Sequence, residues 1–381
     1  MHPAIPNPPR LMPTTPAALR RNNFHAIRIA MALLVVWSHC FALYYGTEDF
    51  EPVSLLLNGQ YNAGQIAVRV FFIVSGFLIT QSFLNGRTTG SYILKRIRRV
   101  YPGFLAATAI CTFIVVPAFA TGGWQLVTPA TLFDWLWRGL SLQEVIPPAD
   151  AFRNNPSQAV NGALWSIRYE FWFYLGLAAL GVARLLTRRR VMLLILLGAL
   201  AVKAWLEMTG RKPGGGAFEI LIGWPYVWFS MAPFFLMGSV VFLYRPHIPR
   251  SRPWLIGLLL AMLCSAHLFG TSRILFDILC PLALAYALFF IAFAPAMRWP
   301  SMERIGDPSY GTYLYGYPIQ QMVKAAFDLN FPAYMLTCLI LSLIAGLLSW
   351  HLVEKWFLLQ KTCARRPDGP AVSSQTAPGM A

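Results

Sequence analysis

The stretch RIAMALLVVWSHC, residues 28–40, decides how this chain must fold. It is apolar except near its ends, which carry Arg28 and His39. Apolar runs near the roughly 17–25 residues that a helix needs to cross a bilayer recur along the whole chain. An open sheet leaves backbone groups unpaired in lipid, and these runs are too long and continuous for barrel strands. The sequence therefore predicts an all-α fold, a polytopic transmembrane helical bundle.

The composition agrees with a membrane protein. The 381 residues are 57% hydrophobic and 12% charged, with a mean hydropathy of +0.53. A soluble domain usually carries about twice that charged fraction. The net charge of +16 would suggest nucleic acid in a soluble protein. In a membrane protein basic residues gather in cytoplasmic loops and face anionic lipid, so we expect membrane lipids and no nucleic acid as partners.

About ten segments are predicted to cross the membrane. Residues 22–358 form one transmembrane domain, and residues 1–21 and 359–381 are predicted to be disordered cytoplasmic tails. The longest connection, 121–163, contains TLFDWLWRGLSL, which indicates a short interfacial helix with an aromatic face. The predicted spans are 27–45, 66–83, 104–120, 165–186, 191–206, 224–243, 254–269, 276–294, 310–327 and 332–353.

The loop charges predict the orientation. If the N-terminus lies in the cytoplasm, the inner segments hold twenty-one Lys and Arg residues and the outer loops hold five. Cytoplasmic loops carry such an excess in membrane proteins. We therefore expect both termini inside and an even number of spans. There is no clear internal repeat, which counts against a transporter.

Two ionisable residues share one face of the first span. Arg28 and His39 are eleven residues apart, which is close to three helical turns and about 16 Å along the axis. Arg28 is explained equally well as a cytoplasmic anchor. An ionisable residue such as His39 inside a span usually faces the protein interior or a water cavity and indicates function. The alternative is a neutral histidine that forms a hydrogen bond between helices.

The second span contains FFIVSGF, residues 71–77, preceded by Arg69. Gly76 permits close approach of another helix, and Ser75 can form a hydrogen bond across helices. Arg69 lies near the outer end of this span. It can face the acidic outer loop or a buried carboxylate.

A basic cluster, KRIRRVYP at residues 95–102, precedes the third span. Arg96 and Arg99 are adjacent on one helix face, and Pro102 fits a helix start. The cluster with Lys95 is either a topological signal or a phosphate clamp, because guanidinium forks suit multidentate phosphate binding. A nucleotide-bearing donor such as an acyl-CoA fits the second interpretation.

The fourth motif is NGALWSIRYEFWFY, residues 161–174. Glu170 is expected about five residues inside the fourth span, entered from outside, where a carboxylate needs a partner or a proton. His39 and Glu170 are then both expected in the outer half of the membrane. A histidine and a carboxylate together suit general-base chemistry on a hydroxyl. The six cysteines have no spacing typical of metal ligands.

In this order, the motifs resemble the membrane-bound acyltransferase-3 family, which O-acylates surface glycans and similar acceptors. Many members carry a histidine before the proline of the ninth span, where this chain has Gly316 and Tyr317. Either that histidine is not needed here, or Tyr315 or Tyr317 replaces it. The matching elements are Arg28 and His39; Phe71, Phe72, Ser75, Gly76 and Phe77; Arg96, Arg99 and Pro102; Trp165, Ser166 and Glu170; SYGTYLYGYPIQQ at 309–321; and VEKWF at 353–357.

The resemblance implies a multi-pass enzyme of the bacterial inner membrane. It moves an acyl group, foremost acetyl, from acyl-CoA to a glycan or glycolipid hydroxyl, as in exopolysaccharide, lipopolysaccharide or a lipid-linked precursor. Acyl-CoA is the donor substrate, and no permanently bound cofactor is expected. The expected roles are His39 as general base, or acyl carrier in a covalent route; Glu170 orienting His39; Arg28, Lys95, Arg96 and Arg99 holding phosphates; Arg69 or Tyr315 as oxyanion donor; and Ser75, Trp165 and Ser166 lining the substrate site.

Two hypotheses of other classes remain open at this level. A transporter or flippase for a glycan or lipid would use the intramembrane ions as a substrate path and would not need acyl-CoA. A non-catalytic membrane subunit of a polysaccharide-export complex would tolerate replacement of His39 and Glu170. The pattern does not select an oligomeric state.

Overall fold

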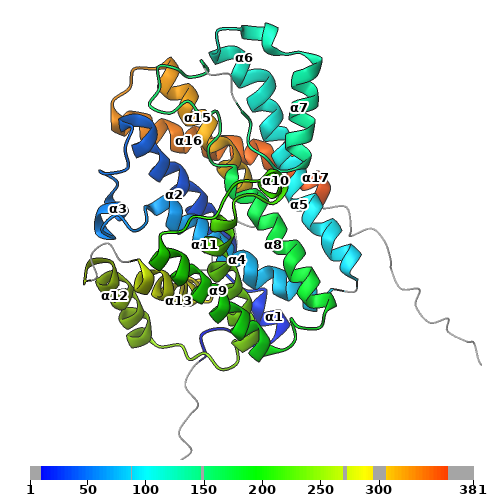
Figure 1. Cartoon of the computed structure of the whole chain (residues 1–381), viewed down its shortest axis with the longest axis vertical. Coiled ribbons are helices and arrows are strands. Elements are labelled where there is room, and N and C mark those ends of the chain that lie inside the picture. The colour runs from blue at the N-terminus through cyan, green and yellow to red at the C-terminus, as the bar shows by residue number, and fades with distance from the viewer. Residues whose placement is uncertain (1–9, 87, 147–149, 269–272, 295–305, 359–381) are drawn as a thin grey trace, which may run out of the picture.

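The computed structural model describes residues 10–86, 88–146, 150–268, 273–294 and 306–358, and these residues are helical without a β-strand (Figure 1). One isolated backbone bridge joins Arg10 to Pro249. The longer helices are α2 (Phe24–Tyr45), α4 (Ala63–Leu84), α5 (Thr89–Ile110), α7 (Pro129–Leu140), α8 (Trp165–Val182), α9 (Arg189–Thr209), α11 (Pro225–Tyr244), α12 (Arg252–Leu268), α13 (Ile274–Ala292), α15 (Ser309–Ala326) and α16 (Phe331–Ser349). The shorter ones are α1 (Pro16–Leu19), α3 (Pro52–Leu56), η1 (Cys111–Val115), α6 (Val116–Phe119), η2 (Gly123–Leu126), α10 (Ala217–Ile222), η4 (Trp350–Glu354) and α17 (Lys355–Leu358).

Each of the ten predicted spans coincides with a helix, and within the described residues seven helical segments are long and apolar enough to cross a membrane. The other three are α12, which has 17 residues, and α8 and α15. The α15 helix is rich in Tyr and Gln. Most of its residues are buried within the protein, so the helix does not need an apolar surface that faces lipid. The count of ten spans and the cytoplasmic position of both termini stay predictions.

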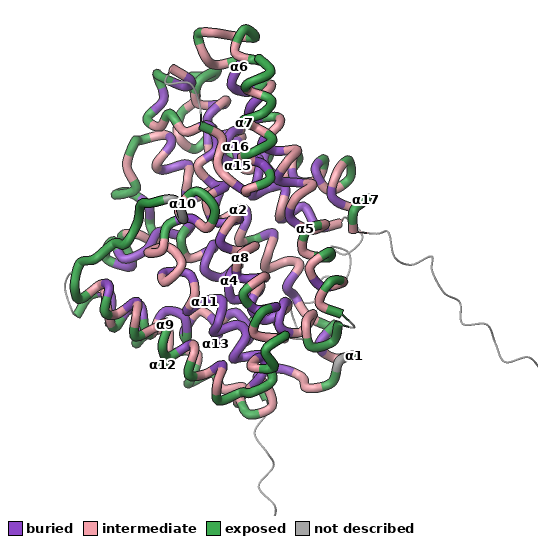
Figure 2. The backbone as a smooth tube through the Cα atoms, turned by 45° about the vertical axis from the view of Figure 1, so that its right-hand side comes forward, coloured by how far each residue is buried: buried purple, intermediate pink, exposed green. Residues whose placement is uncertain are grey.

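The centre of the bundle is held by close crossings of helices at glycines. A Cβ atom on Gly76 of α4 would lie 1.9 Å from the carbonyl oxygen of Phe235 in α11, and one on Gly238 would lie 2.0 Å from that of Ile73. The Ser239 hydroxyl also donates to the Gly76 carbonyl at 3.2 Å. Figure 2 shows buried residues concentrated around α4, α8 and α11, and exposed residues on α9 and α12. The predicted close approach at Gly76 is therefore confirmed.

The third span begins much earlier than the apolar pattern predicts. The α5 helix starts at Thr89, where the Thr88 side chain accepts a hydrogen bond from the Ser91 N–H, and continues through η1 to Phe119. Pro102 therefore lies inside the helix, and the prediction of a helix start there is wrong. The basic cluster belongs to the helix because its apolar face packs on the bundle. Arg96 and Arg99 are thus carried on a helix surface.

The predicted helix in the longest connection is confirmed as α7. It packs along α5, where the Tyr101 hydroxyl donates to the Leu140 carbonyl at 2.9 Å and the Trp135 indole N–H donates to the Thr108 hydroxyl at 3.2 Å. Its other face exposes Phe133. The position of α7 at the membrane interface stays a prediction.

An irregular segment, residues 155–164, leads from this connection into α8 and runs opposite to α15. Irregular backbone at membrane depth is tolerated where protein buries it or where it lines a water-filled cavity. Because the segment descends along α15, α8 begins beside the first turns of α15 rather than at an outer surface. The contacts are Asn155 to Gln321, Ser157 to Tyr317, Asn161 to Leu314 and Ser166 to Tyr313.

Part of the predicted N-terminal tail is ordered. Leu11 and Met12 are buried, and the Leu11 N–H donates to the Ile248 carbonyl at 2.9 Å. The two apolar side chains belong to the main buried core, and the division into one domain and two disordered tails stays a prediction. Residues 1–9 and 359–381 lie outside the described residues, as do six residues used for orientation: Arg87, Arg298, Arg304, Lys361, Arg365 and Arg366.

Candidate active site

A cavity of about 120 Å³ lies among α2, α4, α5, α8 and α15. It is lined by three guanidinium groups, one carboxylate, hydroxyls and an apolar wall, and we call it the arginine cavity. Its position follows from the fold, because the irregular segment 155–164 brings the start of α8 to the level of the arginines. The polar lining consists of Arg28, Ser75, Arg96, Arg99, Ser166, Glu170, Ser309, Tyr310 and Tyr313.

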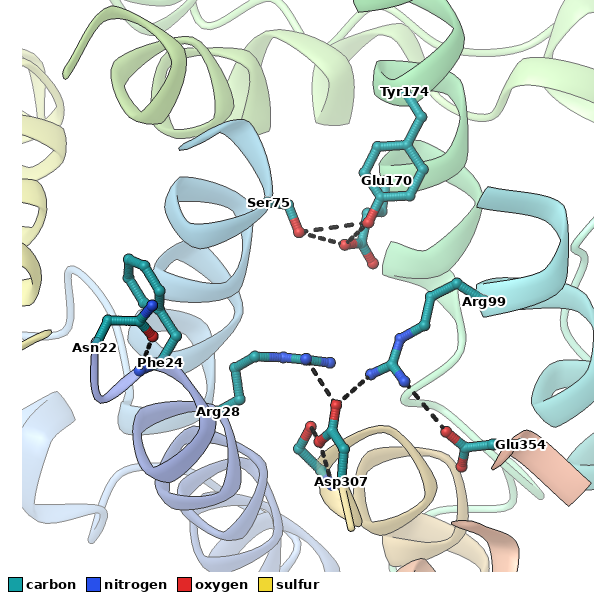
Figure 3. Close-up of polar contacts among 10 residues, drawn as sticks. Asn22, Phe24, Arg28, Ser75, Arg99, Glu170, Tyr174, Asp307 and Glu354 are labelled. Atoms are coloured by element: carbon teal, nitrogen blue, oxygen red, sulfur yellow. Dashed lines mark hydrogen bonds and ion pairs between the residues drawn. The ribbon is translucent and has the colours of Figure 1, made fainter. Parts of the chain in front are cut away.

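Two arginines of the cavity bind one carboxylate oxygen. Arg28 donates to Oδ2 of Asp307 at 2.7 Å, and Arg99 donates to the same oxygen at 2.8 Å. In Figure 3 the two side chains point toward Asp307 from opposite sides. Arg99 also lies 3.6 Å from Oε2 of Glu354. Arg28 and Arg99 are thus brought together as predicted, around carboxylates that the sequence pattern did not single out.

The Asp307 carboxyl precedes α15 and is fixed on its other side. Its Oδ1 accepts hydrogen bonds from the Ser309 hydroxyl at 2.5 Å and from the Ser309 N–H at 3.3 Å. Burial alone raises the pKa of this carboxyl, but the guanidinium groups of Arg28 and Arg99 outweigh burial and hold the pKa well below its ordinary value. Asp307 is therefore an ionised partner of both arginines at neutral pH.

Glu170 faces the same cavity. Its Oε1 accepts a hydrogen bond from the Ser75 hydroxyl at 2.5 Å and another from the Tyr174 hydroxyl (Figure 3). The carboxylate thus has two hydroxyl donors, which meets the requirement for a partner at this depth. Arg96 lines the same space and lies 5.7 Å and 5.8 Å from the ring centroids of Tyr92 and Tyr174.

His39 lies apart from this group. It does not line the arginine cavity, and among the described residues no hydrogen bond joins it to Glu170. Its ring packs edge-on against Tyr317, with ring centroids 5.4 Å apart, and the Tyr317 hydroxyl lies 3.0 Å from the Ser157 hydroxyl. His39 therefore has an aromatic neighbour at the position where Gly316 and Tyr317 depart from the acyltransferase-3 pattern.

The predicted placement of Glu170 in the outer half with His39 is therefore not what the structure has. Glu170 shares a small cavity with Arg28, whereas His39 is eleven residues further along α2, about 16 Å along the helix axis. The prediction assumed that the fourth span begins at the outer surface. The α8 helix instead begins where segment 155–164 ends, inside the bundle. Glu170, five residues into α8, therefore lies at the level of the arginines.

Arg69 lies in a different cluster, away from the arginine cavity. Its guanidinium carbon is 3.5 Å from the centroid of the Tyr61 ring. A guanidinium N–H donates to the Gln65 carbonyl at 2.9 Å. The Tyr61 hydroxyl donates to Asp277 at 2.5 Å, and Lys203 lies 3.4 Å from the same carboxylate. Arg69 thus packs on Tyr61, which binds the buried carboxylate of Asp277, and Arg69 does not line the arginine cavity.

Three further predicted site residues lie outside the arginine cavity. Lys95 is exposed on α5, so it does not join Arg96 and Arg99. The Trp165 ring packs near Tyr169, with centroids 6.1 Å apart. Tyr315 is buried in α15. Ser75 and Ser166 line the cavity as expected.

Sequence reasoning missed Asp307 and Glu354. Asp307 stands two residues before the motif at 309–321, and Glu354 stands inside VEKWF at 353–357, so both motifs contained a usable signal. The π-helical turn η4 places Glu354 inward, where it is 2% exposed, while Leu352 is 70% exposed. Such π-helical turns are frequent at functional sites, but their position cannot be read from apolar periodicity.

One family model matches most of the chain, and several curated proteins are similar to it. The family model described as "Acyltransferase domain" (Acyl_transf_3) matches residues 21–351. An "O-acetyl transferase" of Shigella phage Sf6 is 26% identical over 352 residues, which are 90% of this chain and 98% of that protein. "Nodulation protein 10" of Rhizobium leguminosarum bv. viciae is 25% identical over 77% of this chain and 82% of that protein. The "Putative peptidoglycan O-acetyltransferase YrhL" of Bacillus subtilis (strain 168) is 24% identical over 81% of this chain and 54% of that protein. No solved structure matches the chain.

Proposed function

Because the chain belongs to the Acyltransferase domain family (Acyl_transf_3), we propose that it is an acyl-CoA-dependent O-acyltransferase of the bacterial inner membrane. It moves an acyl group, foremost acetyl, from cytoplasmic acyl-CoA to a hydroxyl of an extracytoplasmic glycan or glycolipid. Membership of the family makes it an acyl-transferring enzyme, and the seven long apolar helical segments found in the described part of the chain agree with a multi-pass membrane protein. The donor, the acceptor and the cell membrane are our assignment.

The arginine cavity is the observation that carries this proposal. Three guanidinium groups face one space inside an apolar bundle. Arginine is the side chain best suited to bind a phosphate through more than one hydrogen bond. An acyl-CoA is both anionic and extended. Its anionic part binds at the arginine level, and its thioester end extends along α2 toward His39.

The acceptor approaches from the outer side along segment 155–164. His39 takes the proton of the acceptor hydroxyl as general base, and the hydroxyl oxygen bonds to the thioester carbonyl carbon. The carbon–sulfur bond then breaks, and the protonated His39 returns the proton to the departing CoA sulfur. The products are an O-acyl ester and free CoA. Glu170 acts in the donor cavity in this scheme, where it holds Ser75 and Tyr174, and it does not orient His39.

The test uses the full chain reconstituted in vesicles with acetyl-CoA that carries a labelled acetyl group. We expect transfer of the label to membrane glycan, and we expect His39→Ala to lower turnover about 10²–10⁴-fold, the usual contribution of a general base. His351→Ala is the matched control, because His351 is exposed on the C-terminal helical segment.

Mass spectrometry of the surface glycan separates the alternatives. Cells that express the wild type should add one acetyl mass per modified sugar, and cells that express His39→Ala should not. Wild-type turnover in His39→Ala contradicts the mechanism. Movement of unmodified glycan without any need for acetyl-CoA supports a flippase and contradicts the proposed function.

A further inference from the structure

Asp307 occupies an unusual position between two helices that are distant in the sequence. Its Oδ2 accepts from Arg28 of α2 and from Arg99 of α5, which are 279 and 208 residues away along the chain. The side chains of Asp307, Arg28 and Arg99 are 12%, 24% and 18% exposed. Charge-assisted hydrogen bonds of this kind are among the stronger ones in proteins. One carboxylate thus sets the distance between two guanidinium groups.

The Asp307 carboxylate is not free to turn away. Its Oδ1 is held by the hydroxyl and the backbone N–H of Ser309, which begins the buried helix α15. Arg99 is held from a second side by Glu354, whose Oε1 accepts from the Ser349 hydroxyl at 2.9 Å. Both carboxylates are therefore fixed by their own helices before any ligand enters.

The charges around the cavity balance. Arg28, Arg96 and Arg99 stand against the carboxylates of Glu170, Asp307 and Glu354. A guanidinium has five N–H donors, and the ion pairs above use only one of Arg28 and two of Arg99. Among the residues that the structure describes, Arg96 makes no ion pair with a carboxylate. The cluster is an ordered frame with unused donors, and it is not a loose cationic patch.

We propose that Asp307 is a positioning residue of the donor site. It holds Arg28 and Arg99 so that their remaining N–H groups bind the anionic part of the donor, while Arg96, which forms no ion pair among the described residues, adds a third guanidinium. Asp307 stays bound to both arginines when the donor is present, and Glu354 supports Arg99 from behind. This inference rests on the proposed function, which places an anionic acyl donor in this cavity.

The experiment compares Asp307→Asn with the wild type, using acetyl-CoA and a fixed glycan acceptor. Asparagine keeps the shape of the side chain but loses the charge that holds both arginines. We expect the KM for acetyl-CoA to rise about tenfold, which corresponds to the loss of about one strong charged hydrogen bond. The value of kcat should change less than the KM, and the KM for the acceptor should not change. Asp307→Glu, which keeps the charge, should recover part of the donor KM.

Two controls bracket this result. Asp134→Asn removes a carboxylate from an exposed ion pair with Arg138 on α7, outside the cavity, and should leave the donor KM unchanged. Glu354→Gln removes only the 3.6 Å contact to Arg99 and should raise the donor KM by a smaller factor than Asp307→Asn. Thermal unfolding in detergent reports whether each variant folds. If Asp307→Asn does not fold, Glu354→Gln decides the matter, and an unchanged donor KM in that variant overturns the proposal.

A lower donor KM in Asp307→Asn also overturns it, because Asp307 would then compete with the donor for the arginines. An unchanged donor KM in a folded Asp307→Asn overturns it as well. Failure of the proposed function gives a different result, since the wild type itself would then show no turnover of acetyl-CoA.

Discussion

His39 and Tyr317 meet ring edge to ring, and this contact depends on the residues around it. A Cβ atom on Gly162 would lie 3.0 Å from the Tyr317 ring, so the absence of a side chain there lets the ring occupy its place. The Tyr317 hydroxyl is held by Ser157 on the same irregular segment. Two residues of segment 155–164 thus fix the aromatic neighbour of the proposed general base.

We expect Tyr317→Phe and Tyr317→Ala to differ in their effect on kcat. Tyr317→Phe keeps the ring and loses one hydrogen bond, so kcat should fall about threefold. Tyr317→Ala also removes the ring that packs on His39, so kcat should fall tenfold or more. The measurement is turnover at saturating acetyl-CoA.

Ser157→Ala is the matched control for this pair, because it removes the same hydrogen bond from the other side. It should reproduce the small effect of Tyr317→Phe. Equal kcat values for Tyr317→Phe and Tyr317→Ala would contradict a role of the ring in positioning His39.

At the scale of elements, the crossing of α4 and α11 sets the depth at which Ser75 reaches Glu170. Gly76 sits next to Ser75, and its missing side chain lets the two helices approach to backbone contact. Small residues at such crossings are typical of membrane bundles. A wider crossing would separate Ser75 from Glu170 and open the arginine cavity.

Gly76→Ala should lower the free energy of unfolding by about 3 kcal/mol or more, since even one methylene in a tight core typically costs about 1–3 kcal/mol. Gly176→Ala on α8 is the matched control, because a Cβ atom there meets nothing within 4 Å. Alanine favours a helix over glycine by about 1 kcal/mol, so this variant should be slightly more stable. Thermal unfolding of both variants in the same detergent checks this, and equal losses would contradict the packing argument.

The apolar pattern predicted the helices well and the depth of their residues poorly. Helix ends agree within a few residues for most spans, because apolar length records how much of a chain faces lipid. It does not record helices that are surrounded by protein, such as α15, or a helix that starts inside the bundle, such as α8. The motif at residues 161–174 was therefore recognised, but Glu170 was assigned to the wrong depth.

Part of the candidate site could be predicted from the sequence, because Arg28, Arg96 and Arg99 belong to recognisable motifs. Asp307 and Glu354 could not be predicted, because their contacts join residues more than 200 positions apart. They also depend on the hydrogen bonds between Asp307 and Ser309 at the start of α15 and on the π-helical turn at η4. Long-range pairs of this kind follow from packing, which a single sequence does not display.

At the scale of the whole molecule, a second buried ionic cluster ties α9 to α13. Lys203 is 4% exposed, pairs with Glu207 and lies 3.4 Å from Asp277. The Tyr226 hydroxyl of α11 donates to Glu207 at 2.8 Å. None of these residues lines the arginine cavity. We therefore expect this cluster to stabilise the bundle without binding the donor.

Lys203→Met should lower the free energy of unfolding by about 3–5 kcal/mol, because it leaves buried carboxylates without their cation. The double variant Lys203→Met/Asp277→Asn should recover part of that loss. The measurement is thermal unfolding in detergent together with the KM for acetyl-CoA, which should not change in either variant. A large change in that KM without a change in stability would contradict a purely structural role.

The irregular segment 155–164 that enters α8 affects how the protein is made. Its polar side chains form hydrogen bonds with residues of α15 that are synthesised 153 to 166 residues later. Until then these polar groups lack their partners on α15, and the segment is held by apolar contacts such as those of Val160 with Cys111 and Val115. Assembly of the enzyme is therefore completed from its C-terminal side, and a nascent chain halted before α15 should be held by the insertion machinery as an unfinished bundle.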